Sequence, residues 1–172
     1  QMYCEGLAYK LTPIEYGGTG GTNTEKMLAL LNNDYDLVKR NGDSVKTGFD
    51  WGNMKGEGVL VDYYTMRMVQ NLRLQMMKLS DQLINENRYD DALNVLNITF
   101  EEMPVEKEQV PADDICYYLC ANYFEAGDTT KGMEIGHTLV SLQLDRLNFF
   151  SDLDNDKFLP YVWPELGRAL FN

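Results

Sequence analysis

Residues 79–104, LSDQLINENRYDDALNVLNITFEEMP, match residues 119–139, LCANYFEAGDTTKGMEIGHTL, at an offset of 40 residues. Each stretch predicts two helices joined by a short turn, because apolar residues at helical spacing flank a turn former and a helix-starting Asp or Thr. The matching positions that would pack are Leu79, Ser80, Leu83 and Ala92 in the first stretch and Leu119, Cys120, Tyr123 and Gly132 in the second. We therefore expect two helical hairpins, with small residues where their helices approach closely.

This pattern resembles the tetratricopeptide repeat, a helical hairpin with a usual period of about 34 residues. The second hairpin comes late, and the extra residues fall between Pro104 and Pro111. The large aromatic residue often found early in such a repeat is replaced by Met76 and Cys116. Two repeats cannot cover their own apolar ends, so we expect capping segments on both sides. The alternative is an unrelated bundle of helical hairpins.

The sequence before the repeats has a different character. Leu7, Tyr9 and Leu11 alternate with small or polar residues, which predicts a short strand that ends at Pro13. A second short strand is predicted at residues 59–61, Val-Leu-Val. These strands indicate a small mixed element ahead of the helices.

Two further helices are predicted outside the matching stretches. Residues 25–38 carry apolar residues at helical spacing, with Thr22 and Glu25 as a capping box. Asp62 predicts the N-cap of a long helix that runs directly into the first repeat.

The predicted fold class is mainly α, with tetratricopeptide-like helical hairpins and a small N-terminal α+β element. We place the α+β cap element at residues 1–61 and the helical-repeat domain at residues 62–172. Residues 157–170 are expected to form the C-terminal cap, interrupted by Pro160 and Pro164.

The composition limits the classes of partner. The net charge is −12, from 27 acidic and 15 basic residues. A surface this negative repels phosphate backbones and anionic lipids, so nucleic acid is excluded as a partner. The longest apolar run, Ile115–Ala121, has seven residues, far short of the roughly 20 that span a bilayer. Because the chain begins at Gln1, we expect it to be a piece of a longer protein.

Motifs for catalysis or metal binding are incomplete. The loop from Gly17 to Gly21 lacks the Gly-Lys-Ser/Thr ending of a phosphate-binding loop and is interpreted as a connector. Asp152, Asp154 and Asp156 begin like a calcium loop, but Lys157 and Trp163 replace its glycine and its bidentate Glu.

The remaining reactive side chains have structural interpretations. His137 is the only histidine, so zinc and triad chemistry are poorly supported. The adjacent carboxylates Glu101-Glu102 and Asp113-Asp114 point in different directions on a helix, which favours a solvated face over acid–base work. We therefore predict no catalytic residue, no cofactor and no metal in this chain.

The three cysteines are interpreted as thiols. Cys116 and Cys120 are four residues apart on a predicted helix, where their Cβ atoms lie about 6 Å apart, beyond the roughly 4 Å of a disulfide. We expect both to be buried. Cys4 has no evident partner in the sequence.

The repeat register also predicts a binding groove. In tetratricopeptide hairpins the first helix of each pair lines the concave face. The residues placed there are Leu74, Met77, Asp81, Asn85, Asp114, Tyr117, Ala121 and Phe124, and the candidate binding residues among them are Met77, Asp81, Asn85, Tyr117 and Phe124. This groove offers acid and no Lys, which disfavours an acidic peptide. An apolar or aromatic-rich peptide, another part of the same protein, or a sugar stacked on Tyr117 or Phe124 fits better. The alternative is that both rings pack against the N-terminal helix.

The flanking motifs resemble one known family. The motifs are residues 5–11 (EGLAYKL), residues 49–53 (FDWGN), and Asp62 followed by Arg67-Met68 and residues 71–73 (NLR). They resemble the C-terminal region of a bacterial multi-pass membrane family of unknown function, itself similar to protein O-mannosyltransferases. The resemblance covers most of the chain and implies a periplasmic or extracytoplasmic tail, tethered to the inner membrane in the full-length protein, with any sugar-transfer residues elsewhere.

The function expected from these observations is a non-catalytic interaction or scaffold domain of a membrane glycosyltransferase-like protein. Its partner would be a protein or peptide, including the membrane domain of the same chain. An independent glycan- or peptide-binding module is the alternative. A hydrolase built on the acidic clusters is disfavoured, because no coherent acid–base constellation is visible.

Overall fold

Helix α2, Tyr63–Asn85, is the long element against which the other helices pack. It begins at Asp62, whose carboxylate accepts a hydrogen bond from the backbone N–H of Thr65 at 2.7 Å, which confirms the predicted N-cap. Its largest buried apolar positions recur at helical spacing: Val69, Met76, Leu79 and Leu83. This stripe gives α2 one face that must be covered by neighbours.

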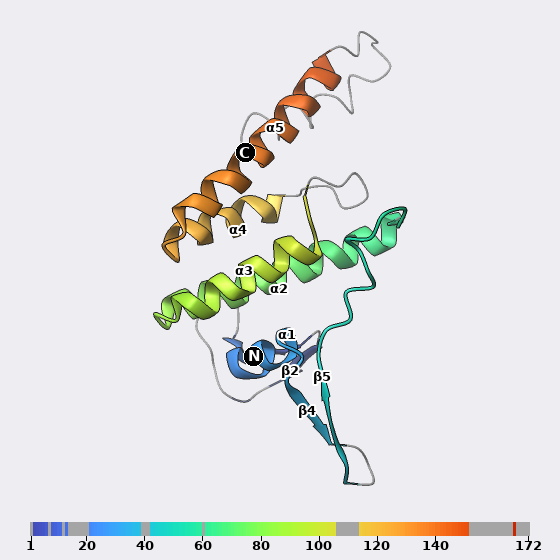
Figure 1. Ribbon diagram of the computed structural model, residues 1–172, viewed down its shortest axis with the longest axis vertical. Helices are drawn as coiled ribbons and strands as arrows, with labels where there is room; N and C mark the ends of the chain where they lie inside the picture. The colour runs from blue at the N-terminus through green and yellow to red at the C-terminus, as the bar shows by residue number, and fades with distance from the viewer. Residues whose placement is uncertain are drawn as a thin grey trace.

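The computed structural model describes residues 2–6, 8–11, 13, 21–38, 42–59, 61–105, 114–151 and 167. Within them the chain forms five helices and five strands (Figure 1). After α2 come α3 (Tyr89–Glu102), α4 (Asp114–Glu125) and α5 (Thr129–Ser151). The mainly helical class and both predicted hairpins, α2–α3 and α4–α5, are confirmed.

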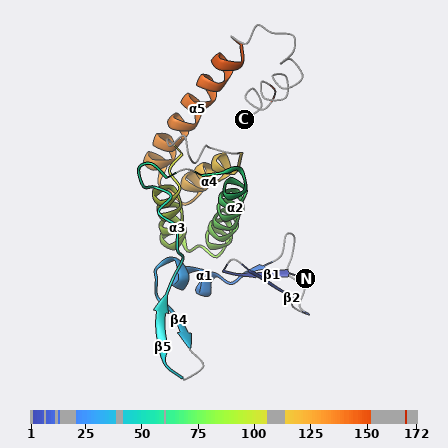
Figure 2. The same ribbon diagram turned by 90° about the vertical axis from the view of Figure 1, so that its right-hand side faces the viewer.

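The helices are arranged in layers. Helices α2 and α3 lie side by side, with α4 and α5 on one side of the pair and α1 with the strands on the other (Figures 1 and 2). The main core is where these layers meet, and it joins Met27, Leu28 and Leu31 of α1 to Met76 and Leu79 of α2 and to Leu119 and Tyr123 of α4. The N-terminal element therefore shares its core with the helical hairpins.

The two hairpins turn at matching positions. Asn87 has a φ of 60° and Gly127 a φ of 95°, so both lie in the left-handed region that ends helices. The same backbone hydrogen bond closes each turn. The N–H of Arg88 donates to the Leu83 carbonyl, and the N–H of Asp128 donates to the Tyr123 carbonyl, both at 2.9 Å. The sequence match therefore extends to the backbone of the turns.

Three strands form the first sheet, in the order β2-β1-β3. Strand β1 (Met2–Glu5) pairs antiparallel with β2 (Ala8–Leu11) and parallel with β3 (Gly21–Thr22). Strand β2 confirms the strand predicted before Pro13, whereas β1 and β3 were not predicted. Gly6, with a φ of 74°, allows the tight turn between β1 and β2.

The helix predicted at residues 25–38 is wrong in its second half. Helix α1 spans Thr24–Leu31 and ends at an Asn32-Asn33 turn, where Asn33 has a φ of 55°. Its cap is also different, because the side chain of Asn23, and not a Thr22–Glu25 box, accepts from the N–H of Lys26 at 3.0 Å. Asparagine tolerates the left-handed conformation and competes with helix continuation, which explains the early stop.

The rest of that segment is a β-hairpin. Strands β4 (Tyr35–Val38) and β5 (Ser44–Thr47) pair antiparallel and project away from the helices (Figures 1 and 2). One face carries Lys46 with its carboxylate partners Asp34 and Asp36, and the other carries the cross-strand pair Leu37 and Val45. Alternation of polar and apolar residues, not the helical period, was the relevant signal.

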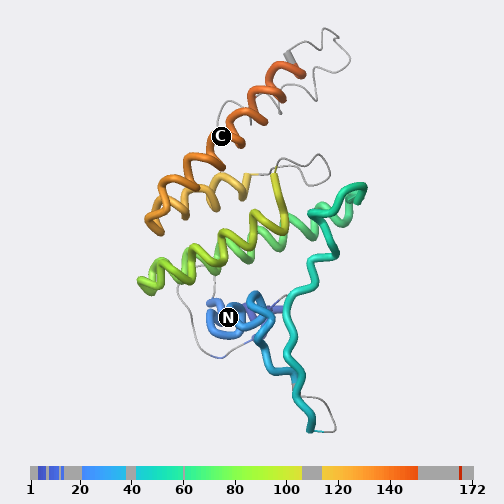
Figure 3. Tube along the Cα trace, in the orientation of Figure 1, coloured from blue at the N-terminus to red at the C-terminus, as the bar shows by residue number. Residues whose placement is uncertain are grey.

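Residues 48–59 connect β5 to the region before the start of α2 (Figure 3). Trp51 and Met54 pack there in a second cluster with Val69 of α2 and Met103 after α3. Neither Val59 nor Val61 lies in a strand, so the strand predicted at residues 59–61 is wrong at both.

Several predicted features lie outside the described residues, namely the loop glycines at 17–20, Asp113, the aspartates at 152, 154 and 156, and the C-terminal cap at 157–170 except Gly167. In the parts of the chain that the structure does describe, no helix has the length and hydropathy to span a membrane.

Shortening the Leu79 side chain tests whether the stability of the fold depends on the buried face of α2. Leu79→Ala removes a fully buried side chain from the main core, so we expect the free energy of unfolding to fall by about 2–5 kcal/mol in urea denaturation. Leu144→Ala is the control, because Leu144 is an exposed leucine of α5, and it should change the stability by less than about 0.5 kcal/mol. Equal losses for the two variants would contradict this core assignment.

A pair of glycine substitutions tests the backbone packing. A Cβ at Gly48 would meet the Asn33 side chain and lie 2.6 Å from the carbonyl oxygen of Leu30, so Gly48→Ala should destabilise the fold by about 1–3 kcal/mol. A Cβ at Gly136, inside α5, would lie 3.6 Å from the Cys120 sulfur, an ordinary contact. Gly136→Ala should therefore raise the thermal midpoint, with a gain of about 0.5–1 kcal/mol.

Candidate binding site

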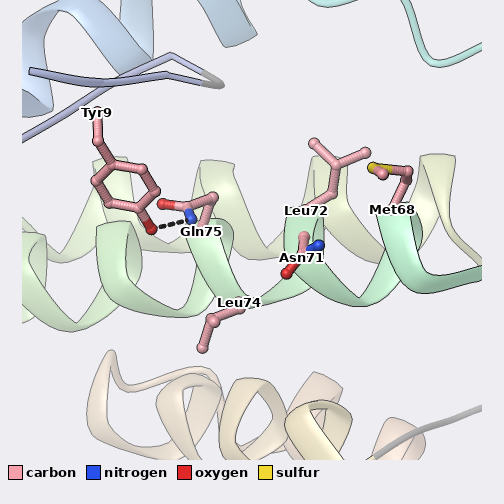
Figure 4. Close-up of a pocket in the computed structure, with 6 residues that line it drawn as sticks. All are labelled: Tyr9, Met68, Asn71, Leu72, Leu74 and Gln75. Atoms are coloured by element: carbon pink, nitrogen blue, oxygen red, sulfur yellow. Dashed lines mark hydrogen bonds between the residues drawn. The ribbon is translucent and has the colours of Figure 1, made fainter.

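A pocket of about 500 Å³ lies between α2 and strand β2 (Figure 4). Its described lining consists of Tyr9, Met68, Asn71, Leu72, Leu74 and Gln75. Five of these residues come from α2 and one from the middle of β2. The volume is in the range of about 300–1,000 Å³ that is usual for ligand sites.

One face of α2 supplies most of the lining. Met68, Asn71, Leu72 and Gln75 are spaced at three, four and seven residues, so they lie on the same side of the helix. Figure 4 shows Met68, Leu72 and Gln75 on the side of α2 that faces the strands, with Leu74 pointing the other way. The pocket is therefore a shallow extension of a helix surface, closed at one end by Tyr9.

The sheet is fixed to this face by side-chain hydrogen bonds. Gln75 accepts from the Cys4 thiol at 2.9 Å and donates to the Tyr9 hydroxyl at 2.5 Å (Figure 4). Gln82, two turns later, accepts from the backbone N–H of Thr22 at 3.0 Å. Through these bonds the sheet covers α2 from Gln75 to Gln82. The same face of α2 is open before Gln75, and the Tyr9 ring lies at the boundary.

The thiol of Cys4 is part of this connection and not a reactive group. It is buried, and burial raises its pKa, while the nearby Lys78 ammonium opposes the shift. A protonated thiol is required for the bond to Gln75. Cys116 and Cys120 are also buried free thiols, as predicted, and burial raises the pKa of Cys120.

The open half of the face is apolar and exposed. The side chain of Met68 is 63% exposed, and Tyr64, one turn earlier on the same face, is also exposed. Tyr64 stacks edge-on against Tyr63, with ring centroids 5.6 Å apart. Apolar and aromatic side chains gathered beside two amides form a surface suited to binding a partner.

The adjacent carboxylates Glu101 and Glu102 share one structural partner. Glu101 and Glu102 both pair with Lys55, at 3.1 and 2.7 Å. His137 is exposed on α5. Within the described ranges, no three or more His, Cys, Asp or Glu side chains converge as metal ligands would.

The residues predicted to line a groove have identifiable neighbours in the structure. On α2, Met77 packs against the main core, Asp81 accepts from the Asn122 amide of α4 at 2.5 Å, and Asn85 is exposed at the end of the helix. Asp81 is therefore a link between the two hairpins.

The predicted groove residues of α4 contact α5 or solvent. Tyr117 packs into the cluster between α4 and α5, and the ring of Phe124 lies beside Gly132 of α5. Asp114 and Ala121 are exposed. Leu74 is the predicted groove residue that lines the pocket.

Sequence reasoning missed most of the pocket. Tyr9, Met68, Asn71, Leu72 and Gln75 were not proposed as binding residues. The available signal was the pair of amides at positions 71 and 75 on one helix face beside Met68 and Leu72. The position of Tyr9 could not be read from spacing, because it depends on docking of the sheet.

Comparisons of the chain with protein-family models, with curated proteins and with solved structures give no match.

Thiol labelling tests the docking of the sheet. At pH 8, Cys4 in the folded chain should react with a thiol reagent at least tenfold more slowly than in urea, because it is buried and its pKa is raised. The stabilisation from the protonated thiol is present below the unfolded pKa of about 8.5 and is lost as the pH rises towards the folded pKa. A cysteine introduced by Met133→Cys on α5 is the exposed reference, and equal rates would show that β1 is not docked on α2.

Proposed function

We propose that this chain is a non-catalytic interaction domain that binds an extended segment of a protein partner at the pocket between α2 and β2. The observation that carries the proposal is that the pocket adjoins the edge strand of the first sheet. Among the described strands, β2 pairs with β1 alone. An edge strand beside an apolar pocket is the arrangement used when peptides bind by strand addition.

The register shows which backbone groups face the free edge. Cys4 lies opposite Tyr9, and the Cys4 carbonyl accepts from Asn23, on the side of β3. Cys4 and Tyr9 are therefore a non-hydrogen-bonded pair, and in an antiparallel ladder such pairs alternate with bonded ones. The N–H and C=O groups of Tyr9 and Leu11 then point away from β1, towards the free edge.

Tyr9 combines two properties that a peptide site requires. Its side chain lines the pocket, and its backbone faces outward for pairing. The four side chains of β2 are all exposed, and no other described strand pairs with its outer edge. Backbone pairing supplies affinity, and the pocket supplies selection of a side chain.

The two hairpins are tetratricopeptide-like in this proposal. Two observations support it: α2 packs on both α3 and α4, as first helices do in such arrays, and the turns at Asn87 and Gly127 correspond. The proposed binding site differs from the concave groove usual in such repeats, because the pocket lies on the side of α2 that faces the sheet.

The resemblance of the flanking motifs supports an extracytoplasmic scaffold attached to a membrane glycosyltransferase-like protein. Reading the coding sequence upstream of Gln1 and fractionating the full-length product would test it. A product that remains with the membrane after a carbonate wash supports the tether. A soluble product overturns the tether and leaves the peptide site as the function of an independent module.

A glycan is the second candidate ligand. The exposed Tyr9 ring and the Asn71 amide line the same pocket, which favours a glycan because sugars stack on aromatic faces and bond to amides. A glycan array decides between the two ligands. If a glycan binds, if Tyr9→Ala abolishes that binding and if added peptide does not compete, the glycan replaces the peptide as the proposed ligand.

Charging the open face should abolish binding. Peptides selected from a displayed random library should lose at least tenfold in affinity for Met68→Glu, because a carboxylate would be desolvated in the pocket. Met133→Glu is the matched control, since Met133 is 51% exposed on α5, and it should bind normally.

Backbone amide exchange identifies the binding mode. Bound peptide should slow the exchange of the Tyr9 and Leu11 amides, while Ala8 and Lys10 change little because they already face β1. Binding without protection at Tyr9 and Leu11 would overturn strand addition.

A further inference from the structure

The first part of α2 has an unusual charge for this chain. Residues 63–80 contain Arg67, Arg73 and Lys78 and no Asp or Glu, so all 27 acidic residues of the chain lie outside them. Arg73 is buried and donates to the Met103 carbonyl at 3.3 Å. Of the other two cations, Arg67 is exposed and Lys78 is half-buried, in a protein of net charge −12.

Along α2, Arg67 comes before the residues that line the pocket and Lys78 comes after them, beyond Gln75. Arg67, Asn71, Leu74 and Lys78 are spaced at four, seven and eleven residues, so they follow one face of α2, and the middle two line the pocket. Eleven residues of helix rise about 16 Å, which equals about five residues of extended strand. The two cations are therefore separated by the length of a short bound peptide.

These two cations also differ from several others. Carboxylates pair with Lys10, Lys26, Lys46, Lys55 and Arg88. Neither Arg67 nor Lys78 joins an ion pair within the described residues. Their charge is thus available to pair at short range with the carboxylates of a partner, although the chain as a whole is negative.

The geometry points to an acidic–apolar peptide as the occupant, with one apolar side chain in the pocket and carboxylates about five residues apart that pair with Arg67 and Lys78. This inference rests on the proposed function and specifies its ligand. An acidic peptide was disfavoured from the sequence because the predicted groove, which includes Asp81, presents acid and offers no Lys. Asp81 is instead bonded to Asn122 between α2 and α4, and Lys78 lies beside the pocket face.

The test measures binding of three labelled nine-residue peptides to the whole 172-residue chain by fluorescence anisotropy. Each peptide has a central Leu, and the flanking residues are two Glu, two Gln or two Lys. The Glu peptide should bind about tenfold more tightly than the Gln peptide in low salt, and about 0.3 M NaCl should remove most of the difference.

Variants of matched charge locate the effect. Arg67→Gln and Lys78→Gln should each weaken the Glu peptide by about two- to fivefold and leave the Gln peptide unchanged. Lys131→Gln makes the same change in net charge on α5 and should have no effect. Equal weakening by all three variants would overturn the inference, because only the total charge would then matter.

The outcomes separate this inference from the proposed function. If the Gln peptide binds as well as the Glu peptide and Met68→Glu abolishes both, the pocket stands and the acidic ligand is wrong. If no peptide binds, both are wrong. Sedimentation of the chain alone tests whether a second copy of the chain occupies the pocket. Self-association that is abolished by Arg67→Gln would show that the ligand is another molecule of this chain and not a peptide.

Discussion

The fold is anchored on one apolar stripe of α2, which three neighbours must cover at the same time. Helices α1, α3 and α4 all pack against α2, and Met76, Leu79 and Leu83 are fully buried where they meet. The side-chain amide of Asn122 on α4 makes this packing specific, because it donates to Ser80 at 2.8 Å and to Asp81 at 2.5 Å on α2. A buried amide with two partners fixes how far α4 can slide along α2.

The open surface follows from a difference in helix length. Helix α2 has 23 residues, whereas α3 has 14 and α4 has 12. The covering helices are therefore about 14–17 Å shorter than α2 at 1.5 Å per residue. The sheet adds cover around Gln75 and Gln82, so Tyr63, Tyr64 and Met68 remain exposed near the start of the helix.

The parts of the fold that were predictable are those that depend on local pattern. The hairpins were predictable because the repeat sets both their packing faces and their turns, and Asp62 was recognisable as a cap. The segment after Leu31 was not, because an Asn-Asn turn ended the helix within a continuous apolar pattern and strand pairing with residues 44–47 then determined its structure. The pocket could not be found from sequence, since Tyr9 and Gln75 become neighbours only when the sheet docks. The bonds of Asn122 to α2 were not predictable either, because no spacing rule specifies how α4 is oriented on α2.

The hydrogen bonds of Gln75 also have a kinetic consequence. The contacts within each helical hairpin join residues close in the chain, whereas the Gln75 bonds to Tyr9 and Cys4 span 66 and 71 residues. Closing such long loops costs entropy before any contact is gained, so these bonds form after the hairpins. The surface beside β2 is therefore expected to be complete only once the N-terminal sheet has docked, so a partner that recognises it would distinguish the folded chain from one whose sheet is undocked.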